Sequence, residues 1–271
     1  MTLDQALKSG TEAIGRHEAR LLLCHVAGLT LSELILKSNQ PLDIKAEGAF
    51  FAAIDRRIKH EPLQYIMGQW EFMGLTFKTD PRGLIPRPET ELIVEEALKY
   101  KPTQVLDVCT GSGCIAIAMK KLSNASVTAI DISPEALSLA RENATFHNET
   151  DIKFIQSDML SSVDPQTFDI IISNPPYIPT AHIDDLQPEL NHEPKLALDG
   201  GKDGMEPYRR LIPQAISYLT KGGVLLLEIG PPAVKTILLE AGYDIVKIIK
   251  DYSGHDRVIV ATLSQNGGIY V

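Results

Sequence analysis

The chain has 271 residues, 44% of them hydrophobic, and a formal net charge of −9 at pH 7. A chain of this length can bury a sizeable core in one or two domains. No apolar run approaches the roughly 20 residues of a membrane span, and the first residues lack the basic and apolar stretches of a secretory signal, so we expect a cytoplasmic protein without a membrane partner.

The distribution of charge and cysteine excludes further classes. Residues 1–75 contain 8 basic and 9 acidic side chains, a net charge of −1, and the remaining residues have a net charge of −8. Neither part of the chain therefore has the positive field that phosphate binding needs. We therefore predict no direct nucleic-acid partner. The three cysteines, Cys24, Cys109 and Cys114, show no CxxC spacing and predict reduced thiols rather than a disulfide or a metal site.

The first part of the chain shows helical periodicity. Apolar residues recur at spacings of three and four up to about residue 61, and Thr30 and Asp43 are placed as N-caps. In "GQWEFMGLTFKTD", which follows, aromatic and apolar residues alternate on either side of a glycine-containing turn, as in a β-hairpin. We expect a helical domain over residues 1–67 and a hairpin linker over residues 68–85.

The remainder, residues 86–271, is expected to form one α/β domain. It begins with a helix at Pro88, whose first turn contains Glu89 and Glu91. Strands such as "TQVLDVC", "ASVTAID", "FDIIIS" and "GGVLLLEIG" then alternate with helices such as that after Ser133, which indicates a doubly wound, mostly parallel sheet. The short segment "KDYSGHD" joins the last two strands as a hairpin, so the final strand should run antiparallel at or near the sheet edge.

Acidic residues follow three predicted strands at the sheet edge where ligands bind in such folds. Asp107 precedes a glycine-rich turn into a helix, Asp131 follows the next strand, and Asp158 follows the third. A carboxylate at Asp131 can accept both hydroxyls of a ribose, and one at Asp158 could meet the exocyclic amine of an adenine.

The glycine-rich turn has more than one interpretation. The run from Gly111 to Ala116 satisfies the GxGxxG/A fingerprint of nicotinamide dehydrogenases, and glycines can also make a tight turn without binding anything. Asp107 immediately upstream is an odd neighbour for a pyrophosphate but suits a ligand that carries an ammonium and a sulfonium. This favours S-adenosylmethionine.

The strand "FDIIIS" ends in Asn174-Pro175-Pro176-Tyr177. Proline has no N–H, so two in succession leave carbonyl oxygens without competing donors. The Asn174 side-chain oxygen and the Pro175 carbonyl could each accept one hydrogen of a substrate –NH2, while Tyr177 stacks on the planar group. Two such acceptors would localise the nitrogen lone pair and aim it at an electrophile without a strong general base.

At this point the sequence resembles a known family. The motif NPPY occurs in methyltransferases that act on amino groups of adenine or cytosine in DNA and on protein glutamine. The further segments "PLQYIMGQWEFMGLTF", "LIPRPETE", "EPKLALDGGKDGMEPYRRL", "GGVLLLEIG" and "GHDRVIV" resemble the HemK/PrmC family of peptide chain release factor glutamine methyltransferases over nearly the whole chain.

The resemblance implies a Rossmann-like catalytic domain that uses S-adenosylmethionine, releases S-adenosylhomocysteine and methylates the GGQ glutamine of class 1 release factors. It also implies that the helical domain helps to hold the factor; we expect a monomer. The predicted cofactor site comprises Asp107, Cys109, Thr110, Gly111, Ser112, Gly113, Asp131, Ile132, Asp158, Met159 and Asn174. The predicted substrate site comprises Asn174, Pro175, Pro176, Tyr177, Arg87 and Glu89, with Asn174, Pro175 and Tyr177 catalytic; no metal is expected.

The chain departs from the family pattern at Cys109, where glycine is usual, at Met159, often aromatic, and in "EIGPPA", where glutamine commonly follows. Arg87 and Glu89 either close over the site or merely start a helix. Residues 192–211 are long enough for a lid, whereas His182 and His192 are interpreted as surface or hydrogen-bonding residues. A DNA amino-methyltransferase, a methyltransferase for another protein glutamine and a dehydrogenase remain the alternatives.

Overall fold

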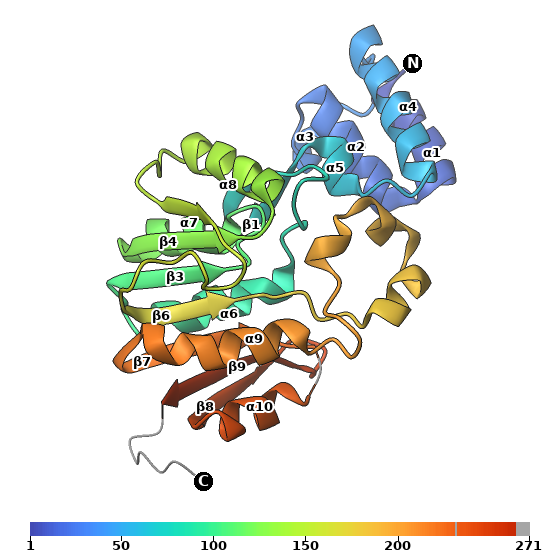
Figure 1. Ribbon diagram of the computed structural model, residues 1–271. Coiled ribbons are helices and arrows are strands. Elements are labelled where there is room, and N and C mark those ends of the chain that lie inside the picture. Colours follow the sequence, from blue (N-terminus) through green and yellow to red (C-terminus); the bar gives the residue numbers. More distant parts are fainter. Residues whose placement is uncertain (231, 264–271) are drawn as a thin grey trace. The chain divides into compact units, whose positions relative to one another are not determined.

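The structure is a computed structural model, described here for residues 1–230 and 232–263 (Figure 1). Its contacts divide the chain into two compact units. The first contains Met1–Gln69 together with Gln187–His192, and the second contains the other described residues. The predicted division at residues 67 and 85 stays a prediction; the contacts add a short later segment to the first unit that the sequence did not suggest.

The first unit consists of short helices. The expected N-caps are confirmed: the Thr30 side chain accepts from the Glu33 N–H, and Asp43 accepts from two backbone N–H groups. Gly15, at φ 84°, divides the first expected helical stretch in two. The helices are α1 (Leu3–Ile14), α2 (Arg16–Ala27), α3 (Leu31–Leu36), α4 (Ile44–Ile58) and α5 (Leu63–Met67).

The expected hairpin forms between β1 (Gln69–Phe72) and β2 (Leu75–Lys78). Its two turn residues, Met73 and Gly74, both have positive φ, as a two-residue turn matched to the strand twist requires. The buried rings of Phe72 and Phe77 meet edge to face with centroids 6.1 Å apart. This aromatic pair fixes the hairpin to the core of the second unit.

A seven-stranded sheet forms the centre of the second unit, in the order β5-β4-β3-β6-β7-β9-β8. Neighbouring strands from β5 to β7 are parallel, whereas β9 is antiparallel to both β7 and β8. The expected antiparallel final strand is therefore confirmed, one strand in from the edge. The strands are β3 (Gln104–Val108), β4 (Ser126–Asp131), β5 (Lys153–Gln156), β6 (Phe168–Ser173), β7 (Leu219–Glu228), β8 (Tyr243–Lys250) and β9 (Asp256–Leu263).

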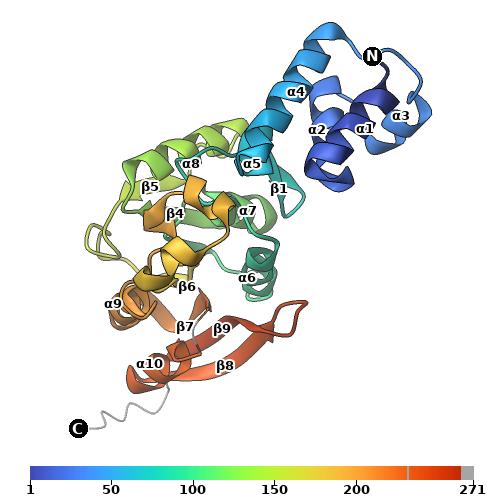
Figure 2. The ribbon, with the colours of Figure 1, turned by 90° about the vertical axis from the view of Figure 1, so that its right-hand side faces the viewer.

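Helices cover both faces of this sheet, as expected for a doubly wound fold (Figures 1 and 2). Alternate strand residues face opposite layers: Val105 packs with α6 and α7, and Leu106 packs with α9 and α10. Ser133 caps α8, as predicted, by accepting from the Ala136 N–H. The helices are α6 (Pro88–Leu98), α7 (Cys114–Ser123), α8 (Pro134–Phe146), α9 (Glu206–Ala215) and α10 (Val234–Glu240), with the 3-10 turn η4 (Ile216–Tyr218) after α9.

This topology brings the carboxyl ends of β3, β4, β5 and β6 to one edge of the sheet, with the order reversing between β3 and β6. The chain after β6 contains the 3-10 turns η1 (Thr180–Asp185), η2 (Pro188–His192) and η3 (Lys195–Ala197) before α9 begins. Among the described helices, none is long and apolar enough to cross a membrane.

Candidate active site

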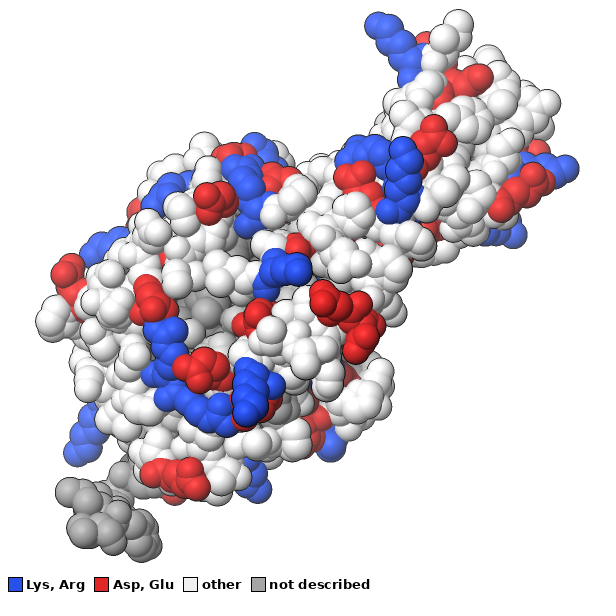
Figure 3. Space-filling model, turned by 45° about the vertical axis from the view of Figure 1, so that its right-hand side comes forward, with Lys and Arg blue, Asp and Glu red and all other residues white. Residues whose placement is uncertain are grey.

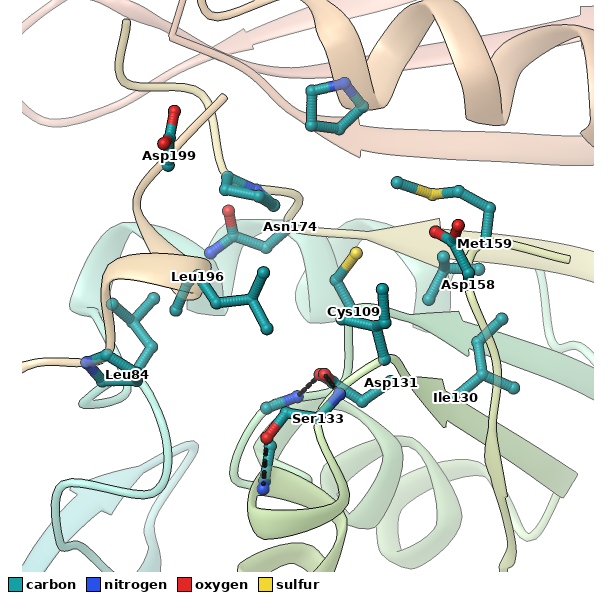
Figure 4. A pocket seen from close by; sticks show the side chains of 18 of the residues that line it. Leu84, Cys109, Ile130, Asp131, Ser133, Asp158, Met159, Asn174, Leu196 and Asp199 are labelled. Carbon is teal, nitrogen blue, oxygen red and sulfur yellow. Dashed lines mark hydrogen bonds between the residues drawn. The ribbon is translucent and has the colours of Figure 1, made fainter. Parts of the chain in front are cut away.

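A cavity of about 510 Å³ opens at this edge within the second unit, a size that suits a small organic ligand. Its walls come from residues at and after the ends of β3, β4, β5 and β6, from the segment before α6 that contains Leu84, and from the segment before α9 together with the start of that helix. In Figure 4, Asn174 and Leu196 lie on one side of the cavity, Asp158 and Met159 on the other, and the Cys109 thiol between them. The residues singled out after four separate strands are therefore brought together.

Asp107 holds the glycine-rich loop after β3 in place through two hydrogen bonds. This fully buried carboxylate accepts from the Thr110 hydroxyl at 2.5 Å and from the Ala116 N–H at 3.1 Å. Burial raises the pKa of Asp107 to about 7. Its Oδ1 atom has no hydrogen-bond partner among the described residues, and such a buried acceptor suits a ligand that brings its own donor, such as an ammonium group.

The turn itself requires glycine at two positions. Gly111 and Gly113 have φ values of 54° and 80°, and a Cβ on Gly113 would lie 3.0 Å from the Cβ of Ala140. Gly111 lines the cavity. The other four predicted residues of this loop do not line it and lie behind its wall: Asp107, Thr110, Ser112 and Gly113. These four residues therefore hold the shape of the loop, and their direct contact with a cofactor stays a prediction.

Asp131 is held in place by the backbone of two loops (Figure 4). Its Oδ2 accepts from the Gly111 N–H and its Oδ1 from the Ser133 N–H, both at 2.9 Å. Burial raises the pKa of Asp131, and these two hydrogen bonds oppose the increase. The carboxylate lines the cavity and retains lone pairs, so its position suits the predicted contact with ribose hydroxyls.

Four more of the predicted cofactor residues line the cavity, Cys109 among them. Asp158 pairs with Arg210 at 2.6 Å, and Met159 and Ile132 add apolar surface. Cys109 and Met159 adopt left-handed backbone conformations, with φ values of 61° and 49°. This conformation is one that glycine adopts without strain, so the side chains at these two positions carry a backbone cost.

The NPPY loop enters the cavity through Asn174 and Pro176, whereas Pro175 and Tyr177 do not line it. The Asn174 Nδ2 donates to the Thr90 hydroxyl at 3.1 Å, and that hydroxyl donates to Glu228 at 2.7 Å. The amide nitrogen is therefore engaged, and the Asn174 Oδ1 remains available as the acceptor that the sequence predicted.

Tyr177 is packed among glycines that lie far from it in the sequence. A Cβ on Gly230 would lie 2.4 Å from its ring, one on Gly200 2.7 Å from its Cα, and one on Gly204 2.3 Å from its carbonyl oxygen. Burial raises the pKa of the Tyr177 phenol. Close packing against these three positions holds the ring in place, and the raised pKa keeps its phenol neutral.

The expected lid is fastened to the NPPY loop by a short backbone ladder. The Ile178 N–H donates to the Leu198 carbonyl at 3.0 Å, and the Gly200 N–H donates to the Ile178 carbonyl at 2.8 Å. Part of this segment, including Leu196, lines the cavity. The two histidines, His182 and His192, are exposed and do not line it.

Arg87 and Glu89, which the sequence left open between two roles, do not line the cavity. Arg87 forms an ion pair with Glu193, a buried carboxylate that also accepts from the Ile85 N–H at 3.1 Å. We did not predict Glu193, Thr90 or Glu228 from the sequence. Of these three, only Glu228 could have been noticed in the sequence, because it ends an apolar strand and a buried acidic residue must find a partner.

No group of three or more His, Cys, Asp or Glu side chains that could hold a metal ion occurs within residues 1–230 and 232–263. On the face in Figure 3, the second unit has a hollow with side chains of both charge signs around it. The predicted absence of metal and nucleic acid stays a prediction.

The chain matches two family models. Residues 88–201 match the methyltransferase small domain, and residues 3–68 match the PrmC N-terminal domain. It is also similar to a solved methyltransferase from Pyrococcus furiosus, with a TM-score of 0.55 and 25% identity over 70% of this chain and 89% of that one. The fold and cavity therefore define a methyltransferase of the Rossmann-like class.

Curated relatives narrow this class. The release factor glutamine methyltransferase of Geobacter sulfurreducens is 42% identical over 90% of this chain and 88% of its own length. That of Moorella thermoacetica is 41% identical over 96% of this chain and 98% of its own. The chain belongs to the release factor glutamine methyltransferase family.

A first prediction concerns Asp131. Because a hydrogen bond to a charged group contributes about 1.5–3 kcal/mol, Asp131→Asn should weaken S-adenosylhomocysteine binding by about 10-fold to 100-fold. Asp169→Asn is the matched control, since Asp169 also accepts backbone N–H groups, from Thr103 and Gln104, but stands at the start of β6 away from the cavity. Titration calorimetry measures both variants; wild-type affinity in Asp131→Asn would remove this residue from the ribose contact.

Proposed function

We propose that this protein transfers a methyl group from S-adenosylmethionine to the side-chain amide nitrogen of the GGQ glutamine in class 1 peptide chain release factors. The products are N5-methylglutamine and S-adenosylhomocysteine. One observation carries the proposal: Asn174 lines the cavity with its nitrogen engaged by Thr90, which leaves its oxygen as an acceptor beside two prolines that have no N–H.

The chain's own groups account for how an amide could react. An amide nitrogen is a weak nucleophile because its lone pair is delocalised into the carbonyl. The Asn174 Oδ1 and the Pro175 carbonyl would each accept one amide hydrogen and so hold the –NH2 group with its lone pair directed at the methyl donor. The amide nitrogen would form the new N–C bond as the S–C bond to the methyl group broke, and it would then lose one proton to solvent.

Several residues would hold the cofactor in this scheme. Asp131 would accept the ribose hydroxyls, and Met159 and Ile132 would cover the adenine. Asp107 would brace the glycine-rich loop from behind the cavity wall. When bound, the cofactor supplies an electrophilic methyl group. We further propose a monomeric, cytoplasmic enzyme in which the helical domain, residues 1–67, helps to hold the release factor.

The test is a transfer assay with methyl-labelled S-adenosylmethionine. Its arms are a purified class 1 release factor, the same factor with the GGQ glutamine replaced by alanine, and an adenine-containing DNA duplex. We expect label on the native factor alone. Equal labelling of the alanine variant would contradict the glutamine as acceptor, and label on the duplex alone would favour the DNA amino-methyltransferase alternative.

A further inference from the structure

We propose that Thr90 and Glu228 are positioning residues that orient the Asn174 amide so that its oxygen, rather than its nitrogen, faces the substrate. This inference rests on the proposed function, because it concerns how the acceptor amide is held. Neither residue lines the cavity, and neither was singled out by the sequence analysis. They act through Asn174 and do not touch the reacting atoms.

The three residues come from three separate elements that meet behind the cavity wall. Asn174 follows β6, Thr90 is in the first turn of α6, and Glu228 ends β7. The distances are 3.1 Å from Asn174 Nδ2 to Thr90 Oγ1 and 2.7 Å from Thr90 Oγ1 to Glu228 Oε2. Thr90 is 3% exposed and Glu228 2%, so solvent has little access to these hydrogen bonds.

The chemistry of these groups gives the chain of hydrogen bonds one direction. An ionised carboxylate can only accept, so the single hydroxyl proton of Thr90 must point at Glu228. The Thr90 oxygen is then left with lone pairs only, and it must accept from a donor. Asn174 meets this requirement with its NH2 group, which turns its Oδ1 to the other side.

Protonation of Glu228 would remove this constraint. A neutral carboxyl could donate to Thr90, whose own proton could then point at Asn174 and favour the flipped amide. The flipped NH2 would oppose the N–H groups of a glutamine substrate instead of accepting from them. The chain of hydrogen bonds therefore supports catalysis only while Glu228 is ionised.

The environment of Glu228 places this change near neutral pH. Burial raises its pKa to about 7, against the opposing effect of the Thr90 hydrogen bond. The charge of Arg257 also opposes the increase, and Tyr208 donates to the Glu228 backbone carbonyl at 2.8 Å. The other titratable groups whose charges interact with Glu228 are Arg87, Glu89, Tyr177 and Cys114.

Variants of Thr90 test the proposal. Thr90→Val keeps the shape but removes the hydroxyl, so kcat should fall by about 10-fold to 100-fold while S-adenosylhomocysteine affinity changes little. The free energy of unfolding should also decrease, because the buried Glu228 carboxylate loses the hydroxyl that donates to it. Thr90→Ser keeps the hydroxyl and should retain most of the activity. The control is Thr128→Val, a similarly buried threonine in β4 that does not line the cavity; its kcat should match wild type.

The pH profile of Glu228→Gln separates positioning from packing. In the wild type, kcat should fall as the pH decreases below about 7, because protonation removes the constraint on Thr90. Glu228→Gln does not ionise in this range, so its kcat should be low and lack that decrease. An unchanged acid limb in this variant, or a Thr90→Val enzyme as active as wild type, would overturn the proposal.

The same assay distinguishes two kinds of failure. If the wild-type enzyme methylates the release factor but Thr90→Val and Thr90→Ser behave alike, the positioning role is wrong and the proposed function stands. If the wild-type enzyme does not methylate the factor, the proposed function is wrong, and the orientation proposed for its substrate is wrong with it.

Discussion

Replacing Asn174 by alanine should reduce kcat for methyl transfer by about 100-fold to 1,000-fold. This is the typical effect of losing one preorganised hydrogen-bond partner in an active site. The variant loses the Oδ1 acceptor, so of the two proposed acceptors for the substrate amide only the Pro175 carbonyl would remain. Asn174 directly follows a largely buried strand, which makes a compensating movement of the loop costly.

Cofactor affinity provides the internal control for this variant. Asp131 and its backbone partners remain intact in Asn174→Ala, so S-adenosylhomocysteine should bind with a dissociation constant within about 10-fold of wild type. Methylation by Asn174→Ala at a near-normal rate would contradict the role given to this side chain. A large loss of cofactor affinity would instead assign Asn174 mainly to the cofactor.

Gly204→Ala should be the most damaging of the glycine substitutions. The new Cβ would lie 2.3 Å from the carbonyl oxygen of Tyr177, a backbone atom that cannot rotate away. The loop after Asn174 must therefore shift, which should reduce methyl transfer by about 100-fold, because small displacements near a reacting group have effects of this size. The clash and the strained backbone should also reduce the free energy of unfolding by about 2–5 kcal/mol.

Gly222→Ala is the matched control for this substitution. The two glycines have nearly the same φ, 75° for Gly204 and 82° for Gly222, but nothing lies within 4 Å of a Cβ on Gly222. Only the backbone strain of about 1–2 kcal/mol should appear, and kcat should be unchanged. Denaturant unfolding and the transfer assay measure both variants. Equal behaviour of the two would show that contact with Tyr177 is unimportant.

Much of the fold could be predicted from local signals. Thr30, Asp43 and Ser133 cap helices where their spacing to apolar residues suggested, and the alternation of apolar strands with helices indicated the parallel sheet. The final antiparallel strand followed from a loop too short for a crossover. These features depend on neighbours in the sequence, and the sequence therefore contains them.

The residues that line the cavity could be predicted from the sequence, but the side-chain contacts that hold them in place could not. Asn174 and Asp158 follow strands and Asp131 ends one, and the rule that parallel strand ends meet at one edge predicts that they surround one cavity, as they do. The contacts of Thr90 with Glu228 and of Arg87 with Glu193 join positions more than 100 residues apart. Side-chain partners at such separations are set by tertiary packing and leave no periodic signal.

The most direct test of the account is to locate the methyl group itself. A release factor incubated with the wild-type enzyme and S-adenosylmethionine would be digested and analysed by tandem mass spectrometry. We expect one added methyl group, on fragment ions that contain the GGQ glutamine side chain, and at most about 1% of that modification in the same time when Asn174→Ala replaces the wild-type enzyme. A methyl group on any other residue, or an unmodified GGQ peptide after prolonged incubation with active enzyme, would contradict the central claim.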